Sequence, residues 1–296
     1  MKLMTFTTKE SSEEIVGVVT QDGQGVIAVK DLGLPYTTMN QLIEAATPQE
    51  LKQLCHSAQD AAHKAFPLDK VVKLAPIPQP KQDILCLGIN YLAHAEESAR
   101  FKKETFGGQR SKAVYFSKRV NRAVGDGGDI PSHAPLVDSL DYETELAVII
   151  KKDAIKVVPA DAYDYVFGYT ILNDVSARNL QTSHKQWYFG KSLDGFCPMG
   201  PWIVTADEIP APPALDIRCW VNGQLRQEST TSLLIFDVAH VISELSQGMT
   251  LKAGTILSMG TPAGVGMGFE PPRFLKPGDV VECYIEKIGT LRNTVR

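Results

Sequence analysis

A group of acidic residues lies where two predicted strands begin and end. Glu143 and Glu145 lead into the apolar run Leu146–Ile150, and side chains alternate along a strand, so the two carboxylates point to the same face. Asp174 follows a second run, Tyr165–Leu172. Carboxylates a few ångströms apart repel one another unless a cation or a proton lies between them. Without cysteine or histidine ligands nearby, they favour Mg²⁺, Mn²⁺ or Ca²⁺; the alternative is a solvated, acidic strand end.

A histidine and a glutamate are spaced to work together as a general base. His94 and Glu97 lie three residues apart, so on a helix they share one face and can hydrogen-bond. A carboxylate beside an imidazole raises its basicity and fixes its orientation, as proton abstraction requires. Lys191 follows the aromatic-rich stretch Trp187–Gly190, which can desolvate its ammonium. The simpler interpretations are a surface His–Glu pair and a solvated lysine.

Three further polar residues carry groups that can donate to a ligand. Arg178 and Gln181 come four and seven residues after Asp174, on one helical face if a helix begins there. Arg178 can grip a carboxylate with a bidentate fork, or it can pair with Asp174 for structure alone. Thr261 stands in a glycine-rich turn whose backbone can approach a ligand closely. A plain connecting turn would have the same pattern.

Other conspicuous residues are given no chemical role. Gly125–Gly128 has no Lys-Ser/Thr after it in P-loop register, so it is predicted to be a tight turn. His184 is interpreted as a structural histidine. Nothing around Cys197 indicates an activated thiolate.

The hydrophobic pattern of the remaining chain predicts a mainly β (α+β) catalytic domain. Strands are expected at 84–87, 145–150, 165–172, 202–205, 216–221 and 280–285. Helices are expected at 92–104, 175–186 and 235–247. Asn222-Gly223 is a strong signal for a type I′ hairpin. Many strands with few helices argue against a doubly wound α/β sheet.

Residues 1–75 are predicted to form a small N-terminal α/β domain. A β-hairpin and two short helices, broken at Pro48, are expected within it. Leu74–Lys81 contains three prolines and suits a stiff connector. The catalytic domain is therefore expected to span 76–296.

Composition excludes several classes of protein. The 296 residues are 44% hydrophobic and 22% charged, an ordinary globular mix, and the formal net charge of −4 predicts no nucleic-acid partner. No run approaches the length of a membrane helix, and the N-terminal residues lack the apolar stretch of a signal peptide. The five cysteines are scattered and never form a CxxC pair, which favours a reducing, cytoplasmic setting.

Several stretches resemble the fumarylacetoacetate hydrolase family and follow its order along about 85–270. The segment Leu87–Glu97 is similar to the family's Gly-x-Asn-Tyr-x-x-His-x-x-Glu motif. Two metal motifs, a Lys-Ser segment and a late glycine-rich turn are similar to Asp141–Val148, Asn173–Gln181, Lys191–Pro201 and Gly260–Gly266. One such motif is weak, but five in order are highly specific.

The resemblance implies a role for each candidate residue. Glu143, Glu145 and Asp174 are expected to bind Mg²⁺, Mn²⁺ or Ca²⁺, His94 and Glu97 to activate a water, Lys191 to stabilise an oxyanion or enolate, and Arg178, Gln181 and Thr261 to contact the substrate. The implied fold is a mixed β-sandwich roll, usually dimeric. Phe101, Phe106 and Arg110 are expected to help set which acyl group is accepted.

The implied activity is metal-dependent hydrolysis of a carbon–carbon bond in a small β-diketo acid of the acylpyruvate or fumarylpyruvate type. The same enolate-stabilising site also suits an oxaloacetate decarboxylase or tautomerase, or a 2-keto acid hydratase or isomerase of aromatic catabolism. A non-catalytic protein that binds a metal or an organic acid is the remaining alternative.

Overall fold

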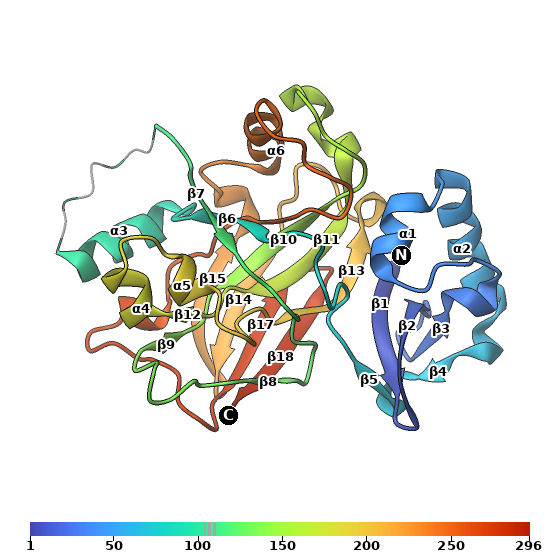
Figure 1. The fold of residues 1–296 in the computed structure, drawn as a ribbon, viewed down its shortest axis with the longest axis horizontal. Coiled ribbons are helices and arrows are strands. Elements are labelled where there is room, and N and C mark those ends of the chain that lie inside the picture. Colours follow the sequence, from blue (N-terminus) through green and yellow to red (C-terminus); the bar gives the residue numbers. More distant parts are fainter. Residues whose placement is uncertain (104, 106–107, 109–110) are drawn as a thin grey trace.

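The structure, a computed structural model, describes residues 1–103, 105, 108 and 111–296 (Figure 1). Its centre is a large mixed sheet. From edge to edge this sheet contains β4 (Phe66–Pro67), β3 (Gly25–Ala28), β2 (Ser11–Val19), β1 (Lys2–Thr8), β13 (Met199–Thr205), β11 (Val166–Asn173), β10 (Thr144–Ile150), β16 (Ile256–Ser258), β6 (Ile84–Gly88) and β7 (Val114–Lys118), with β5 (Val71–Lys73) paired to β1. Every residue of β10 and β11 is buried, which explains why both strands read as continuous apolar runs.

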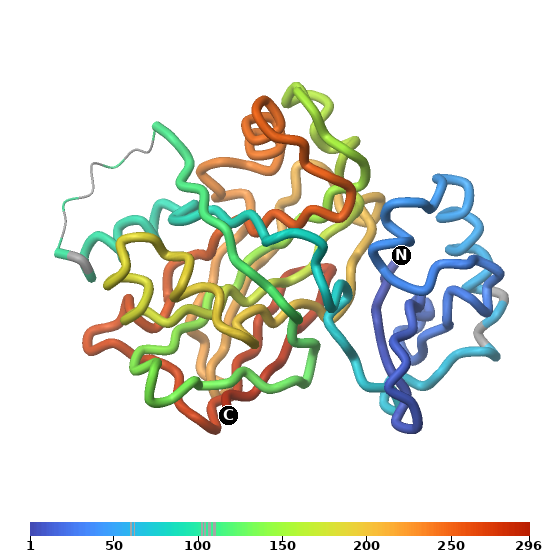
Figure 2. Tube along the Cα trace, in the orientation of Figure 1, coloured from blue at the N-terminus to red at the C-terminus, as the bar shows by residue number. Residues whose placement is uncertain are grey.

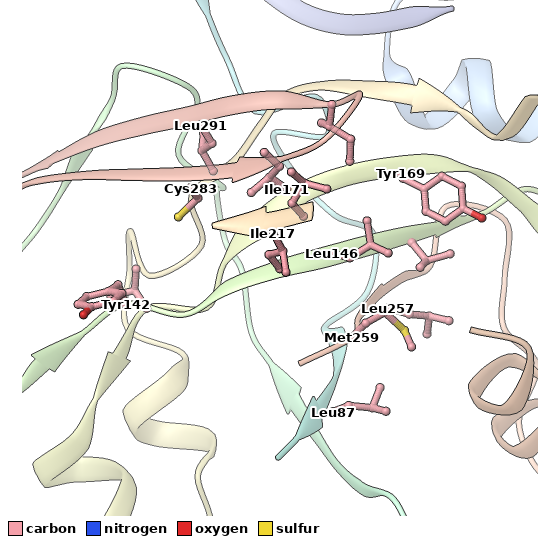
Figure 3. Packing of buried hydrophobic residues seen from close by; sticks show 14 of the residues in the cluster. Leu87, Tyr142, Leu146, Tyr169, Ile171, Ile217, Leu257, Met259, Cys283 and Leu291 are labelled. Atoms are coloured by element: carbon pink, nitrogen blue, oxygen red, sulfur yellow. The ribbon is translucent and has the colours of Figure 1, made fainter. Parts of the chain in front are cut away.

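A second sheet packs against the first to form a roll. It contains β15 (Gln224–Thr230), β14 (Asp216–Val221), β17 (Val280–Ile285), β18 (Gly289–Val295) and β8 (Asp129–Ile130), and a two-stranded ribbon joins β9 (Leu140–Asp141) to β12 (Ser176–Ala177). The residues of β17 alternate between buried and partly exposed, as one covered face predicts. Leu146 and Ile171 of the large sheet lie with Ile217, Cys283 and Leu291 of the second in one core (Figure 3).

The N-terminal strands extend the large sheet. β1 pairs antiparallel with β13, with Lys2 opposite Val204, so the two parts of the chain share one sheet. Figure 2 traces the segment that follows β5 back toward the roll. Ala75 and Ile77 of this proline-rich connector are fully buried, and Ile77 belongs to a core shared with the N-terminal residues. The division at 75/76 remains a prediction.

Short helices cover the edges and ends of the sheets (Figure 1). The α-helices are α1 (Met39–Ala45), α2 (Pro48–Asp60), α3 (Leu92–Lys102), α4 (Arg178–Ser183), α5 (Tyr188–Lys191) and α6 (Val238–Ser246). The 3-10 turns are η1 (Val29–Leu32), η2 (Ala62–Lys64), η3 (Leu68–Lys70), η4 (Pro159–Tyr165), η5 (Ala206–Glu208), η6 (Thr231–Leu233) and η7 (Gly266–Gly268). Among the described residues, no helix is both long and apolar enough to cross a bilayer.

The predicted mainly β fold is confirmed, and the elements expected from the pattern are present with shifted ends. The helix expected at 175–186 is shorter, because residues 176 and 177 pair with β9 before α4 begins. The predicted hairpin at Asn222-Gly223 has positive φ at both residues, as a type I′ turn requires. The strands that were not predicted are β1, β4, β5, β7, β8, β9, β12, β16 and β18.

Candidate active site

Glu143, Glu145 and Asp174 meet where β10 begins and β11 ends. The two strands are antiparallel neighbours, and the Asp174 N–H donates to the Glu143 carbonyl at 2.8 Å, so residues far apart in sequence come together. One oxygen from each carboxylate lies within 4.8 Å of the others, and all three side chains are buried. The structure therefore brings together the three predicted metal ligands.

The surroundings of Glu145 are the strongest indication that the acidic group can bind a cation. It is 1% exposed and accepts hydrogen bonds from Ser258 Oγ at 2.5 Å and Gly260 N at 2.9 Å. Among the described residues it has no cationic partner within ion-pair distance. Burial, Asp174 and Glu143 raise the pKa of Glu145 well above its usual range. A divalent ion among these oxygens would supply the missing positive charge, so the residues fit a metal.

Lys191, at the end of α5, lies against the same carboxylates. Its Nζ donates to Glu143 Oε2 and to Asp174 Oδ2, at 2.6 Å each, and lies 5.2 Å from the centre of the Phe116 ring. Burial disfavours the ammonium, but Asp174 and Glu143 outweigh it and raise the pKa of Lys191 to about 12. Lys191 is therefore buried, as the sequence predicts, and its two carboxylate partners favour its charged form.

A second buried lysine, Lys118 at the end of β7, was not predicted. Its side chain is fully buried, and Nζ donates to Asp174 Oδ1 at 2.7 Å and to the Val175 carbonyl at 3.0 Å. The third hydrogen bond goes to the carbonyl of Lys191. A single lysine at a strand end has no spacing signature, so only the fold reveals it.

Arg178 is fixed by acidic neighbours other than the one considered from the sequence. Its Nε donates to Asp141 Oδ2 at 2.9 Å, and its Nη2 forms an ion pair with Glu143 Oε1 at 2.7 Å. Nη1 donates to Gln181 Oε1 at 3.0 Å. The alternative of a structural pair with Asp174 is thus replaced by pairs with Asp141 and Glu143. Burial opposes the charge of Arg178, but these two carboxylates outweigh it and raise its pKa.

Asp141 is the centre of this network, and its removal is expected to be costly. The carboxylate, fully buried, also accepts from the backbone N–H groups of Gly266 at 2.6 Å and Met267 at 3.0 Å. Asp141→Ala leaves Arg178 with Glu143 as its remaining carboxylate partner and leaves the Gly266 and Met267 N–H groups without their acceptor, so we expect a loss of about 3–5 kcal/mol in the free energy of unfolding. Chemical denaturation measures it. Asp216→Ala, which breaks the exposed pair with Arg218, should cost less than about 1 kcal/mol; equal losses would contradict the prediction.

His94 and Glu97 form a buried pair on α3. His94 Nδ1 lies 2.9 Å from Glu97 Oε2, and the side chains are 5% and 6% exposed. Glu97 Oε1 accepts from the Gly264 N–H at 2.9 Å, which anchors the carboxylate to the glycine-rich turn. The predicted pair is therefore formed, and it leaves Nε2 of His94 as the nitrogen that can exchange a proton.

The turn η7 leaves room for this pair only because residue 268 is a glycine. A Cβ built on Gly268 would lie 1.8 Å from Glu97 Oε1, so Gly268→Ala must displace the carboxylate. We expect turnover to fall at least about tenfold as the orientation of His94 is lost, while metal affinity stays the same. Gly248→Ala is the matched control, because no atom lies within 4 Å of the added Cβ. Steady-state kinetics beside a metal titration would test this; unchanged turnover in Gly268→Ala would contradict it.

The other two predicted substrate residues are partly engaged within the protein. The Thr261 hydroxyl donates to the Thr144 carbonyl at 2.9 Å and accepts from Gln227 Nε2 at 2.7 Å. It therefore holds the turn in place. The side-chain carbonyl oxygen of Gln181 accepts a hydrogen bond from Arg178, so its amide NH₂ is the group that can donate to a bound acid.

These groups surround one narrow cavity of about 40 Å³, room for a few water molecules. Its lining combines acid–base groups and hydrophobic side chains: His94, Glu143, Glu145, Arg178, Gln181, Lys191, Thr261, Phe101, Phe116, Trp187 and Met267. Of the three residues expected to set acyl selectivity, Phe101 lies in this lining. Phe106 and Arg110 fall outside the described residues.

His184, Cys197 and the Gly125–Gly128 turn, to which the sequence analysis gave no chemical role, make structural contacts. His184 Nδ1 lies 3.1 Å from the Leu180 carbonyl oxygen, and the ring packs edge-on against Phe189. Burial raises the pKa of Cys197 to about 12, which keeps its thiol protonated. A backbone hydrogen bond from Gly128 N to the Gly125 carbonyl closes the predicted tight turn.

Comparisons with known proteins identify the family of this chain. The family model described as fumarylacetoacetate (FAA) hydrolase C-terminal matches residues 83–296. The oxaloacetate tautomerase YisK of Bacillus subtilis (strain 168) is 45% identical over 230 residues, which cover 78% of this chain and 75% of that protein.

Solved structures share the whole fold. A fumarylacetoacetate hydrolase from the psychrophilic Exiguobacterium antarcticum is 38% identical, with a TM-score of 0.82 over 100% of this chain and 99% of that one. A maleylpyruvate hydrolase from Sphingobium sp. SYK-6 is 29% identical, with a TM-score of 0.75 over 100% and 98%. The family model covers well over half of the sequence, and the predicted resemblance is confirmed: this chain belongs to the fumarylacetoacetate hydrolase family.

Proposed function

We propose that this protein is a divalent-metal-dependent enzyme that interconverts the keto and enol forms of a small 2-keto dicarboxylic acid of the oxaloacetate type. The observation that carries the proposal is a buried His94–Glu97 pair and a buried Lys191 around one narrow cavity. Enolisation needs a proton carrier and a cation for the enolate oxygen, but no space for a second reactant. The relative named as an oxaloacetate tautomerase supports the choice of substrate.

Each residue has a defined task in this reaction. Glu143, Glu145 and Asp174 would hold the ion, which supplies polarisation of the substrate's carboxylate and keto oxygens. In enol formation His94, oriented by Glu97, takes the proton from the carbon between the keto and distal carboxylate groups, and the keto oxygen takes a proton from solvent; ketonisation reverses both transfers.

The charged and polar groups around the proton carrier complete the site. Lys191 stabilises the negative charge that develops on the keto oxygen. The Gln181 amide donates to the distal carboxylate, and Arg178 fixes Gln181 and Glu143 in place.

Hydrolysis of a carbon–carbon bond in an acylpyruvate or fumarylpyruvate is the second candidate. A histidine held by a carboxylate can also activate water, and a structural relative is a maleylpyruvate hydrolase. This reaction needs room for both an acyl group and a water beside the keto acid. The relative named as an oxaloacetate tautomerase favours tautomerisation as the first candidate.

One set of assays separates the two functions. The purified protein is mixed with the enol form of oxaloacetate, with Mg²⁺ and with a chelator, and ketonisation is followed by the loss of ultraviolet absorbance. Acetylpyruvate and fumarylpyruvate are incubated in parallel, with products identified by mass. Metal-dependent ketonisation without pyruvate release supports the tautomerase. Pyruvate plus the matching acid, with no faster ketonisation, would replace it by the hydrolase.

The family resemblance also leads us to propose a homodimer. Light scattering on the eluted protein would test it, with a mass near twice 32.4 kDa expected.

A further inference from the structure

The cavity lining contains a buried hydroxyl that the proposed reaction does not use. Ser98 lines the cavity and is 4% exposed. Two other hydroxyl side chains in the described lining, those of Thr182 and Thr261, donate to the backbone carbonyls of Arg178 and Thr144, at 2.9 Å each. The Ser98 hydroxyl has no hydrogen-bond partner among the described residues, so it can still donate to a ligand.

The stability of α3 does not explain a serine at this position. Ser98 lies within Leu92–Lys102, away from either end, and serine is a weaker helix former than alanine. A buried hydroxyl without a partner also loses the hydrogen bonds that it made to water in the unfolded chain. Alanine would therefore leave the helix at least as stable, so a bound ligand is the better explanation for the hydroxyl.

The residues that α3 contributes to the cavity follow the order of the groups in a bound keto acid. His94, Ser98 and Phe101 stand at positions i, i+4 and i+7, on one face of the helix. His94 is buried and Phe101 is 39% exposed, so this face runs from the interior toward solvent. Ser98 lies one turn, about 6 Å along the axis, beyond His94. A substrate whose central carbon faces His94 therefore extends its distal group toward Ser98.

Gln181 lines the same cavity from α4 and has a free donor in its amide NH₂. The two cations of the lining, Arg178 and Lys191, are paired with protein carboxylates, which leaves the neutral hydroxyl and amide for the distal group. Resting on the keto–enol function proposed above, we propose that Ser98 is a substrate-binding residue that, with the Gln181 amide, binds the distal carboxylate. The site would thus prefer 2-keto dicarboxylic acids to 2-keto monocarboxylic acids.

Ser98→Ala is expected to raise the KM for enol-oxaloacetate about 10–100-fold and to leave kcat within about twofold, because the lost hydrogen bond is made equally in the bound substrate and the transition state. The Tm should not fall. Ser243→Ala is the matched control, since Ser243 lies inside α6, outside the cavity lining, and should behave like the wild type. An unchanged KM in Ser98→Ala, or a lower kcat at the same KM, would overturn the inference.

Two acids that undergo no keto–enol exchange test binding by itself. L-Malate and L-lactate differ only in the distal carboxylate, and calorimetric titration of the Mg²⁺-loaded protein with each gives their dissociation constants. Ser98→Ala should weaken malate binding at least about tenfold and leave lactate binding unchanged. Equal weakening of both, no weakening, or a wild type that binds malate no more tightly than lactate would overturn the inference. Should Ser98→Ala fail to fold, Ser98→Cys gives the same comparison, because a thiol is a weak donor.

The inference and the proposed function fail separately. A protein whose preference for malate depends on Ser98, but which ketonises no oxaloacetate, would defeat the function alone. Metal-dependent ketonisation with the same KM in Ser98→Ala and the wild type would defeat the inference alone.

Discussion

Replacing His94 by alanine is expected to lower the rate of enol-oxaloacetate ketonisation by about 10²–10⁴-fold, the usual contribution of a positioned acid–base group. His94 lines the cavity, and its partner Glu97 is fixed to the glycine-rich turn by the Gly264 N–H. A histidine on the surface of the protein does not reach this cavity, so it cannot take the place of His94. Metal binding should be unaffected. Ketonisation assays with Mg²⁺ and a parallel metal titration would measure both effects.

The control for His94→Ala is already present in the chain. His240 and Glu244 form a His–Glu pair on α6, but at 46% and 33% exposure it faces solvent. His240→Ala should therefore turn over like the wild type. A His94→Ala protein with full activity would exclude the pair as the proton carrier, and any loss of folding would appear in its circular dichroism spectrum.

Replacing Glu145 by glutamine is expected to abolish metal-dependent turnover, a loss of about 10³-fold or more, without destabilising the metal-free protein. The pKa of Glu145 is raised above its usual 4.5 by burial, Asp174 and Glu143. The metal-free fold therefore retains a proton that the unfolded chain releases, and its stability falls as the pH rises from that value through the raised pKa. Glutamine is neutral throughout, so the variant lacks this decline.

Thermal unfolding between about pH 5 and pH 8, with a chelator and then with Mg²⁺, would measure these effects. The wild type should gain stability from Mg²⁺, and Glu145→Gln should gain little. Glu228→Gln, at an exposed carboxylate paired with Arg218, is the control and should respond like the wild type. Full stabilisation of Glu145→Gln by Mg²⁺ would rule out Glu145 as a ligand.

The sequence predicts the parts of the site that have a local spacing. Glu143 and Glu145 share a face through strand alternation, and His94 and Glu97 share one through helix periodicity. Their buried meeting place, and the position of Lys191 beside it, follow from the family motifs in order. The choice between tautomerase and hydrolase does not, because one arrangement of charged groups serves both reactions.

Contacts between distant segments leave no such signal. Lys118 reaches Asp174 across 56 positions, and Asp141 accepts from the Gly266 and Met267 amides more than 120 positions later. Ser258 belongs to a three-residue strand too short to recognise. In the same way, the sequence of β1 does not reveal its partner, since any strand edge can offer the same backbone groups.

The register between β1 and β13 also sets an order of events on the ribosome. Lys2 pairs with Val204, so at about 5–20 residues per second the partner strand is made about 10–40 s after β1. β5 can cover β1 at Phe6–Thr8 in that interval, but the edge at Lys2 and Leu3 has no partner until β13 is made. An open strand edge can pair with another chain. Nascent chains on neighbouring ribosomes of one messenger RNA are therefore most prone to associate during this interval.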